Sequence, residues 1–431
     1  MKNLLLILLT VCTLSVSAQT VTKKKSPPLS DGTPESVGMS AERLTRIDSL
    51  CMKAVTDQKV PGVIALVARN GKIVYHKAFG MDDPSTGKAI KKDDIFRIAS
   101  QTKAITSTAV MMLWEEGKFA LDDPISKYIP EFKNPQVLRS FEAKDTSYTT
   151  EPAKSEITIR QLLSHTSGLG YGFIDSDPRM KMIYAKAGIV EAWTTDKVYT
   201  SDNIKKLARL PLRGNPGEAY SYCMGLDVLG YFIEVVSGMP FDVFLKKRIF
   251  EPLGMNDTWF YLPADKESRL VSVQNLADGK WTKLAGTGSF DPNYPVKGAK
   301  TILSGGGGLS STAKDYASFL QMYLNGGDLN GKRILSRKTI EVIMSNQIGN
   351  LWGENPDAYQ GLAFGVVTEK GAQKGGSGSA GTFWWGGYFN TQYFGDPKEK
   401  VIGIIMKQTV GQVADDTDSK FRILVEQAID D

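Results

Sequence analysis

The sequence is poor in the residues that hold metals and form disulfide frameworks. Its 431 residues include only two histidines and three cysteines. Cys12 lies in the amino-terminal apolar segment, which leaves Cys51 and Cys223 for the folded part. Two thiols are too few for a zinc cage or a disulfide scaffold, although an oxidising compartment would permit one bridge. We expect two free, half-buried thiols, no metal site and no cofactor.

Neither histidine has surroundings typical of a catalytic base. His76 lies in an alternating, strand-like segment, where a half-exposed structural residue is the expected interpretation. His165 lies in the polar, turn-like stretch from Ser164 to Gly168, and no pattern typical of a histidine triad surrounds it. We interpret His165 as a structural hydrogen-bonding residue.

Beyond its first residues, the sequence also lacks any apolar run long enough to cross a bilayer. Residues 1–18 combine Lys2, an apolar run from Leu4 to Val16 and a small-residue cleavage site, which is typical of a secretory signal peptide. A lipoprotein signal at Cys12 is the weaker alternative, because Val11 stands where a small residue is expected. We expect export to the periplasm or outside the cell, and a mature chain without stable membrane insertion.

The charge is not concentrated in a way that predicts a polyanionic partner. The net charge of +5 is spread along the chain, and the one local run is Lys23 to Lys25. This run lies in a Ser- and Pro-rich stretch over residues 19–35, which we interpret as a flexible linker. We expect no nucleic acid partner, and the pattern carries no prediction of the oligomeric state.

Both ends of the chain have the patterns of an α+β fold. Near the amino end, two alternating apolar segments are separated by Asn70-Gly71, a signal for a two-residue hairpin turn. The carboxy-terminal end repeats such segments before a helix. The predicted elements are a helix from Gly38 to Val55, strands at Val63–Ala68, Lys72–Phe79, Thr382–Trp385, Thr391–Phe394 and Val401–Met406, and a helix at Asp418–Ile429. We expect a central antiparallel sheet, built from both ends of the chain and flanked by helices.

The middle of the chain is mostly helical by spacing. Ile98 to Gly117 and Asp227 to Leu253 have helical patterns, whereas Pro152 to Thr158 and Trp259 to Lys300 are turn-rich and have no clear pattern of a helix or strand. We expect one domain over residues 36–431. Its α/β part covers about 36–100 and 300–431, and its mostly helical part about 101–299.

A serine nucleophile can be activated by lysine when the two residues are rigidly linked. On a helix, residues three apart share a face, so Ser-x-x-Lys at a helix start places the amine beside the hydroxyl. The helix amino terminus adds backbone donors for an oxyanion. The sequence contains three matches, namely Ser85 with Lys88, Ser100 with Lys103, and Ser311 with Lys314.

The surroundings of the three serines favour Ser100. Ser85 lies in a turn, so its lysine would point into solvent, and Ser311 opens a helix whose lysine belongs to an amphipathic surface pattern. Ser100 follows strand-like apolar residues and precedes a mainly apolar helix from Ala104 to Trp114. Lys103 would then lie in a low-dielectric wall, where an unpaired ammonium is costly and the neutral amine is favoured. The alternative is a capping serine with a snorkelling lysine.

The segment from Phe96 to Lys103 resembles the Ser-x-x-Lys motif of class C β-lactamases, penicillin-binding proteins and family VIII carboxylesterases. The resemblance extends over nearly the whole mature chain. Its further segments are Leu121 to Pro130, Leu162 to Leu169, Pro216 to Glu218 and Gly307 to Thr312. It implies a fold of the serine β-lactamase and penicillin-binding protein superfamily, with the nucleophile in a cleft beside a mainly helical part. It also implies that Ser100 is the nucleophile and Lys103 its proton acceptor.

A second family element is a tyrosine that shares the proton transfer with the lysine. The resemblance places this tyrosine at Tyr222, with Tyr220 as the alternative register. Cys223 and Met224 stand where the family often has Ser or Ala and then Asn, so the amide that contacts a β-lactam side chain in β-lactamases is missing. The run from Asp227 to Gly230 resembles the esterase branch.

The third family element in β-lactamases is Lys-Thr-Gly, whose cation helps to hold the substrate carboxylate. This chain has Trp385, Gly386 and Gly387 instead, which resembles family VIII esterases. An indole in place of an ammonium favours apolar or uncharged substrates. Trp384 as the register, or plain core packing of Trp385, remain alternatives. By the same alignment, the backbone N–H groups of Ser100 and Tyr388 would form the oxyanion hole.

The resemblance implies a serine hydrolase that acts on a small-molecule ester or amide. Our preferred function is cleavage of small carboxylic esters through an acyl-enzyme on Ser100, with Lys103 and Tyr222 moving the proton. Three alternatives stay open. They are a β-lactamase or D-amino-acid peptidase or amidase that uses the same residues, an acyltransferase, and a non-catalytic binding protein of the cell envelope.

Overall fold

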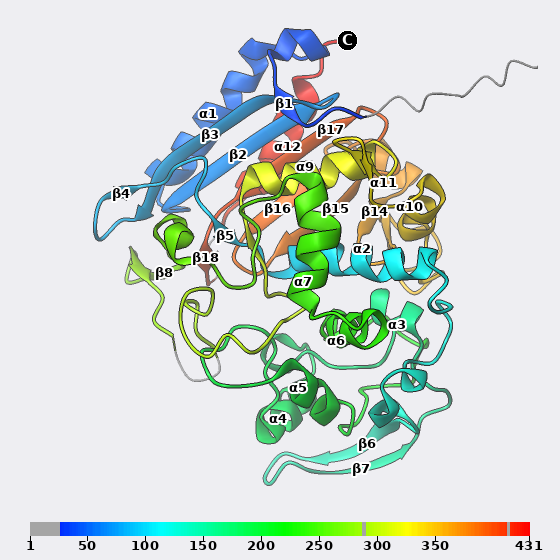
Figure 1. Cartoon of the computed structure of the whole chain (residues 1–431). Coiled ribbons are helices and arrows are strands. Elements are labelled where there is room, and N and C mark those ends of the chain that lie inside the picture. Colours follow the sequence, from blue (N-terminus) through cyan, green and yellow to red (C-terminus); the bar gives the residue numbers. More distant parts are fainter. Residues whose placement is uncertain (1–25, 287–289, 412–413) are drawn as a thin grey trace, which may run out of the picture.

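The structure is a computed structural model that describes residues 26–286, 290–411 and 414–431. The predicted signal peptide and the first part of the predicted linker lie outside the described residues. Figure 1 shows a twisted sheet with helices on both faces, and a second group of helices and loops, coloured cyan to green, at one end of the molecule. The fold is mixed α and β with a mostly antiparallel central sheet, so the predicted fold class is confirmed.

The central sheet has nine strands in the described part of the chain, in the order β1-β3-β2-β17-β16-β15-β14-β13, with β4 pairing with β3. All pairs are antiparallel except β1 with β3. The strands are β1 Ser30–Asp31, β2 Gly62–Arg69, β3 Lys72–Asp83, β4 Lys88–Ala89, β13 Ala358–Gln360, β14 Gly365–Val367, β15 Phe383–Gly387, β16 Thr391–Asp396 and β17 Val401–Met406. Strand β2 pairs with β17, so the two ends of the chain meet in the middle of the sheet, as Figure 1 shows.

The turn between β2 and β3 follows the predicted two-residue geometry. Asn70 and Gly71 have positive φ angles of 50° and 77°, as a type I′ hairpin turn requires. The predicted bounds of β17 are confirmed. A flexible linker was predicted over residues 19–35. Its last part is not free, because Ser30 and Asp31 form strand β1 and pair with β3.

The alternation of side chains along β2 explains why the sheet is covered on both faces. Ile64, Leu66 and Ala68 pack in one core with helices α2 (Thr102–Glu115) and α9 (Ala313–Leu324), whereas the residues between them pack with α1 (Ala41–Thr56) and α12 (Thr417–Gln427). Every residue of β2 is buried. Each large aliphatic side chain buried in this way contributes about 1.5–3 kcal/mol.

The middle of the chain forms short helices and two small hairpins. Its helices are α3 Ile159–Leu163, α4 Pro178–Ala187, α5 Thr200–Leu207, α6 Gly225–Ser237, α7 Phe241–Leu245, a π-helical turn at Lys246–Phe250, and α8 Glu251–Leu253. Its hairpins are β6 Gln136–Glu142 with β7 Ser147–Pro152, and β8 Gln274–Ala277 with β9 Lys280–Lys283. The remaining short elements are β5 Phe96–Arg97, β10 Ser310–Ser311, β11 Asp328–Leu329, β12 Lys332–Arg333, β18 Thr409–Val410, α10 Arg337–Met344 and α11 Glu369–Gln373.

The single helix predicted from Asp227 to Leu253 is wrong, because the chain breaks and bends by 80° after α6. Gly238 ends α6 in the left-handed conformation, with φ 69°, and Pro240 precedes α7. Within the described residues no single helix is long and apolar enough to cross a membrane. The bent pair from Gly225 to Leu253 passes that test by length and composition when its halves are taken together.

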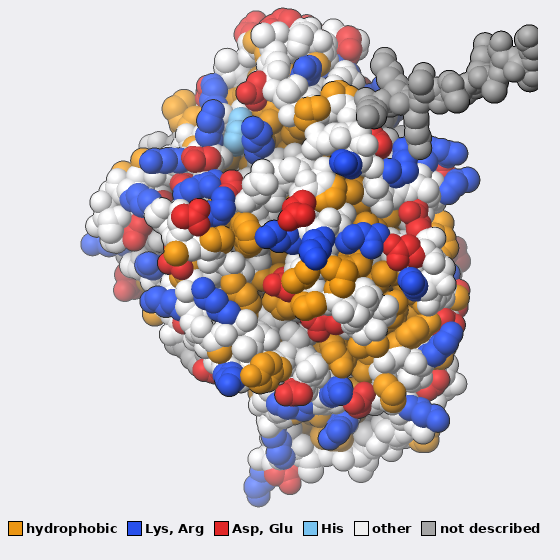
Figure 2. All heavy atoms as spheres, viewed as in Figure 1, with side chains coloured by type: hydrophobic (Ala, Val, Ile, Leu, Met, Phe, Trp, Pro, Cys, Tyr) orange, Lys and Arg blue, Asp and Glu red, His pale blue; other side chains and the backbone are white. Residues whose placement is uncertain are grey.

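The two cysteines are free, as expected, but fully buried rather than half-buried. Burial raises the pKa of Cys51 to about 12 and that of Cys223 to about 11, so both thiols stay protonated. On the face shown in Figure 2, basic and acidic side chains are interspersed between apolar ones, in keeping with a charge that is spread along the chain.

Candidate active site

The segment that carries Ser100 is a sharp turn between a strand and a helix. Strand β5 is followed by a 3₁₀ turn at Ala99–Gln101, which runs directly into α2. Ala99 has φ 44°, a conformation that costs a non-glycine residue about 1–3 kcal/mol and persists only where packing enforces it. Its side chain is buried in a cluster that includes Trp193 and Phe389. This packing holds Ser100 at the amino-terminal end of the helical segment.

The hydroxyl of Ser100 lies between the two groups predicted to move its proton. The Lys103 Nζ lies 3.2 Å from the Ser100 Oγ, as expected for residues three apart at a helix start. The phenolic oxygen of Tyr222 lies 2.7 Å from the same Oγ. The structure therefore brings Ser100, Lys103 and Tyr222 together, although the roles of these residues stay predictions.

Lys103 is fully buried, but it is not the unpaired amine that the sequence led us to expect. Besides Ser100, its Nζ contacts the phenolic oxygen of Tyr171 at 2.9 Å and the carbonyl oxygen of Gly306 at 2.6 Å. The carbonyl can only accept a hydrogen bond, whereas both hydroxyls can donate or accept. The three oxygens can thus satisfy either an ammonium or a neutral amine. The alternative of a snorkelling lysine is excluded, because the side chain has no exposed surface.

Tyr171 is a site residue that the sequence analysis missed. Its ring stacks on that of Tyr222, with centroids 5.1 Å apart and planes 17° apart, and Lys103 lies over both rings. Burial raises the pKa of Tyr171 well above its usual value, so it stays a neutral phenol. Because Tyr171 comes from a loop 68 positions after Lys103, no local pattern could have paired the two.

The glycine run from Gly305 to Gly308 positions the carbonyl that binds Lys103. An added Cβ at Gly306 would lie 2.3 Å from the carboxylate of Asp227, which receives the backbone N–H of Gly306. Asp227 itself is buried at the start of α6 and also accepts the hydroxyl of Ser304. A side chain on Gly306 would push the loop away from both Asp227 and Lys103, which explains why a glycine is needed here.

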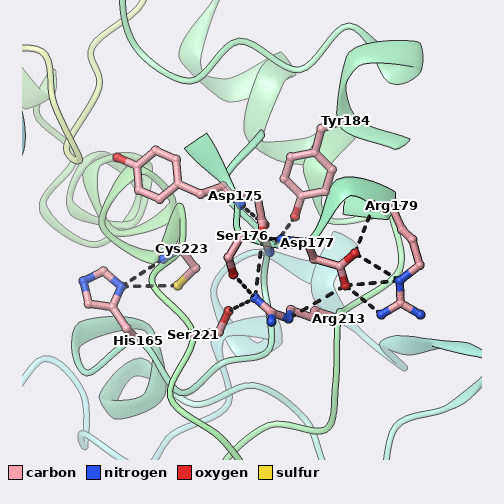
Figure 3. A network of polar contacts seen from close by, with 11 residues as sticks. His165, Asp175, Ser176, Asp177, Arg179, Tyr184, Arg213, Ser221 and Cys223 are labelled. Atoms are coloured by element: carbon pink, nitrogen blue, oxygen red, sulfur yellow. Dashed lines mark hydrogen bonds and ion pairs between the residues drawn. The ribbon is translucent and has the colours of Figure 1, made fainter. Parts of the chain in front are cut away.

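A polar network ties together the two loops that carry Tyr171 and Tyr222 (Figure 3). Asp175 accepts the backbone N–H of Tyr171 at 2.7 Å and lies 3.5 Å from the guanidinium of Arg213. Arg213 in turn donates to the hydroxyl of Ser221, next to Tyr222, at 3.3 Å. The network fixes the backbone of both loops, so Tyr171 reaches the Lys103 amine, and Tyr222 the Ser100 hydroxyl, from a defined direction.

His165 has the environment of a structural residue. It is fully buried with φ 59°, and its Nδ1 accepts the backbone N–H of Cys223 at 3.3 Å, as Figure 3 shows. Burial, together with the charge of Lys103, lowers the pKa of His165 well below its usual value, so its ring stays neutral. Its ring packs against Tyr222 and Trp385. Among the described residues, no group of three or more His, Cys, Asp or Glu side chains could hold a metal ion.

Strand β15 runs past the nucleophile segment at close range. An added Cβ at Gly387 would lie 2.5 Å from the carbonyl oxygen of Ile98, two residues before Ser100. Gly386 and Tyr388 line the same cavity as Ser100. The indole of Trp385 packs instead against Tyr222 and His165, and is not among the residues that line this cavity. The contact of Trp385 with substrate and the oxyanion hole at Ser100 and Tyr388 stay predictions.

We expect Gly387→Ala to lower kcat/KM toward a short-chain ester by about 10²-fold, because a displacement of about 1 Å at reacting groups has an effect of this size. The new methyl group would clash with the backbone of Ile98 and move β15 away from Ser100. Steady-state kinetics of the purified variant would measure this. Gly214→Ala is the matched control, since an added Cβ there meets nothing within 4 Å. Equal rates for the two variants would contradict the prediction.

The nucleophile opens into a small cavity with aromatic walls. Its volume is about 180 Å³, and it is lined by Ser100, Tyr171, Phe173, Ile174, Glu191, Ala192, Trp193, Tyr222, Gly386 and Tyr388. Phe173 and Tyr388 are 40% and 41% exposed, their rings lie 5.8 Å apart, and they form the mouth. A second groove of about 810 Å³ adjoins the cavity and shares Phe173, Glu191 and Tyr388 with it. This arrangement provides a narrow site at the serine and a wider one beside it.

The other two Ser-x-x-Lys matches do not form pairs of this kind. Ser85 bonds to a neighbouring aspartate in a turn, and its partner Lys88 is an exposed residue that pairs with Asp82. Ser311 lies in strand β10 rather than at the predicted helix start, and its hydroxyl contacts Thr258 at 2.8 Å. The structure therefore favours Ser100 over both.

The sequence profile of the family described as Beta-lactamase matches residues 47–427. Among curated proteins, the chain is 31% identical over 360 residues to protein Rv1367c of Mycobacterium tuberculosis, covering 80% of this chain and 85% of that one. It is 29% identical over 377 residues to esterase EstB of Burkholderia gladioli, covering 83% and 88%. Other relatives include a lovastatin esterase, a putative D-alanyl-D-alanine carboxypeptidase and a methylbutanoyltransferase.

A solved structure has the same fold. The structure of EstCE1, described as a hydrolase with promiscuous acyltransferase activity, superposes with a TM-score of 0.75 at 23% identity, covering 90% of this chain and 98% of that one.

Proposed function

Since this chain belongs to the Beta-lactamase family, as a serine hydrolase with esterase, carboxypeptidase and acyltransferase relatives, we propose that it is a carboxylesterase that forms an acyl-enzyme on Ser100. In the first step, the Ser100 Oγ attacks the ester carbonyl and its proton passes to Lys103. The proton moves directly over the 3.2 Å between the Ser100 Oγ and the Lys103 Nζ, while the phenol of Tyr222, 2.7 Å from the same Oγ, assists the transfer. The backbone N–H groups of Ser100 and Tyr388 stabilise the oxyanion.

The second half of the reaction reverses this proton transfer. The tetrahedral intermediate collapses, the alcohol leaves with the proton held by Lys103 and Tyr222, and the acyl group stays on Ser100. Water then attacks the carbonyl of the acyl-enzyme and gives up a proton to the same groups. The bond between the acyl group and the Ser100 Oγ breaks, the Oγ takes back the proton, and the carboxylic acid leaves. Tyr171 keeps its proton throughout, since its pKa is raised far above neutral, and acts as a fixed partner of the amine.

One observation favours esters over β-lactams as substrates. Among the described residues that line the nucleophile cavity, none is lysine or arginine, and Lys103 lies behind the wall with no exposed surface. The described part of the cavity wall instead includes one acidic residue, Glu191. A substrate carboxylate that enters this cavity, as in β-lactams and D-alanyl peptides, would therefore lose its hydration without gaining a cation there.

We expect the purified protein to cleave a short-chain nitrophenyl ester with a kcat/KM at least about 10²-fold higher than for a chromogenic cephalosporin, since an unpaired buried charge costs several kcal/mol. A side-by-side rate assay measures this ratio. A faster rate for the cephalosporin would make β-lactam hydrolysis the function. No turnover of either substrate, together with no labelling by a fluorophosphonate, would favour a non-catalytic envelope binding protein.

Acyl transfer is the second candidate function, and the groove of about 810 Å³ beside the nucleophile cavity supports it. An alcohol or amine acceptor bound there would compete with water for the acyl-enzyme. Addition of primary alcohols to the ester assay would reveal transfer as a new ester product.

We also propose that the chain is exported, from the signal-like pattern over residues 1–18.

A further inference from the structure

Glu191 lies where the nucleophile cavity meets the larger groove. It lines both spaces, together with Phe173 and Tyr388 at the mouth. Neither the proposed proton transfer nor the oxyanion hole uses this carboxyl group. In a cavity with largely aromatic walls, a single carboxyl group is the kind of polar group that binds and orients a ligand.

The position of this carboxyl group is fixed by the backbone beside it. The Glu191 Oε1 accepts the backbone N–H of Phe173 at 3.1 Å. It also occupies the space that a side chain at residue 172 would fill, because an added Cβ at Gly172 would lie 1.6 Å from this oxygen. Gly172 has φ 56°, a conformation that suits glycine. The 3₁₀ turn that begins at Gly172 therefore holds the carboxyl group in place at the mouth of the cavity.

We propose that Glu191 makes this enzyme selective for esters that carry a positively charged ammonium group, which the carboxylate binds in the cavity or the adjoining groove. The inference rests on the proposed esterase function and names its substrate class. An ammonium group that leaves water for this site gains a charge-assisted hydrogen bond to Glu191, whereas an uncharged ester gains nothing from the carboxylate. Among the described residues, no lysine or arginine lines the nucleophile cavity, so the carboxylate meets no competing cation there, whereas Lys181 is the cationic side chain that lines the adjoining groove.

The charge of Glu191 changes near neutral pH. Burial, with a smaller contribution from the charge of Asp227, raises the pKa of Glu191 to about 7. The other charged or titratable side chains that border these spaces or the buried amine are Lys103 on α2, Tyr171, Lys181 on α4, Asp196, Tyr222, Asp227 on α6 and Tyr388. Because the folded-state pKa is raised, the carboxylate and the selectivity for cations form as the pH rises through about 7, and both are lost below it.

The test compares two pairs of esters that differ only in charge. One pair is the nitrophenyl ester of aminohexanoic acid and nitrophenyl heptanoate, with the charge in the acyl group. The other is acetylcholine and dimethylbutyl acetate, with the charge in the alcohol. An alkyl amine keeps its proton up to about pH 10, as lysine does, and the trimethylammonium group is always charged. The ratio of kcat/KM within a pair therefore cancels titrations that affect both esters alike.

In the native protein, we expect the ratio of charged to neutral ester to rise about tenfold from pH 5.5 to pH 8.5 for at least one pair, in line with a carboxyl pKa near 7. In Glu191→Gln, the ratio at pH 8.5 should fall about tenfold and lose its pH dependence. Glu234→Gln is the matched control, because Glu234 accepts a backbone N–H from Phe241 in the same way but lies on α6, away from the cavity. Its ratio should equal that of the native protein.

Each remaining outcome overturns the inference. A ratio in Glu191→Gln within about twofold of the native ratio for both pairs, while Ser100 still reacts with a fluorophosphonate, overturns the selectivity alone. If the native protein cleaves none of the four esters and is not labelled, the proposed esterase function fails and the selectivity fails with it. Equal losses of the ratio in Glu191→Gln and Glu234→Gln would assign the effect to general destabilisation and not to the cavity.

Discussion

Ser100→Ala is expected to lower kcat/KM toward a nitrophenyl ester by at least about 10⁴-fold and to abolish labelling by a fluorophosphonate. The reason is geometric. The Ser100 Oγ lies within reach of both Lys103 and Tyr222 and opens into the cavity, and an alanine leaves the amine with no hydroxyl to activate. The residual rate would come from the oxyanion donors and from binding alone.

Ser85→Ala provides the control for Ser100→Ala. It removes a hydroxyl from the same Ser-x-x-Lys pattern, in a turn where Ser85 bonds to Asp83 and not to its lysine. This variant should keep the native rate and the native labelling. A Ser100→Ala enzyme within about tenfold of the native rate would mean that another residue is the nucleophile, and the site described above would be wrong.

Lys103→Met is expected to lower kcat/KM by about 10³-fold or more, because general-base catalysis contributes about 10²–10⁴-fold and residues that act as one unit fail together. Methionine fills the buried space of the lysine chain but can neither accept the Ser100 proton nor return it to the leaving group. The change also leaves the carbonyl of Gly306 without its donor, so thermal unfolding should be measured beside the rate.

A second buried lysine separates the loss of chemistry from the loss of stability. Lys407 is also buried, and it forms ion pairs with Asp415 and Asp418. Lys407→Met leaves two carboxylates unpaired and should destabilise the fold by about 3–5 kcal/mol, while the molecules that remain folded keep their activity. If Lys103→Met lost activity only in proportion to its folded fraction, its role would be structural and the proposed mechanism would fail.

Elements with a strong local pattern could be predicted from the sequence. The short, continuous apolar run of β17 and the Asn70-Gly71 turn determine local geometry, so their predictions are confirmed. The break after α6 carried a usable signal as well, since Gly238 and Pro240 are the residues that end and restart helices, and the apolar spacing on both sides concealed it. The β6–β7 hairpin lacks such a signal, because its second strand is mostly exposed and polar.

Apart from Tyr222, which the family resemblance indicated, the parts of the site that depend on distant contacts could not be predicted. Ser100 and Lys103 are three residues apart, so a helical pattern was enough to place them together. Tyr171, Gly306 and Glu191 reach the same place through loops whose course depends on the packing of the whole domain. The sequence was enough to place the candidate groups Ser100 and Lys103 side by side, whereas the residues that line the cavity became visible only in the structure.

The pairing of β2 with β17 affects how the chain can fold during its synthesis on the ribosome. Residue Arg69 of β2 lies opposite Val401 of β17, so the middle of the sheet cannot close until almost the whole chain has been made. At about 5–20 residues per second, β2 waits roughly 20 to 70 seconds for its neighbour. All eight of its residues are buried in the finished fold, so during this time β2 pairs with β3 on one edge only and lacks helices α9 and α12, which later cover its faces. The unpaired edge and uncovered faces of this strand therefore make the incomplete chain more prone to aggregation than the finished fold.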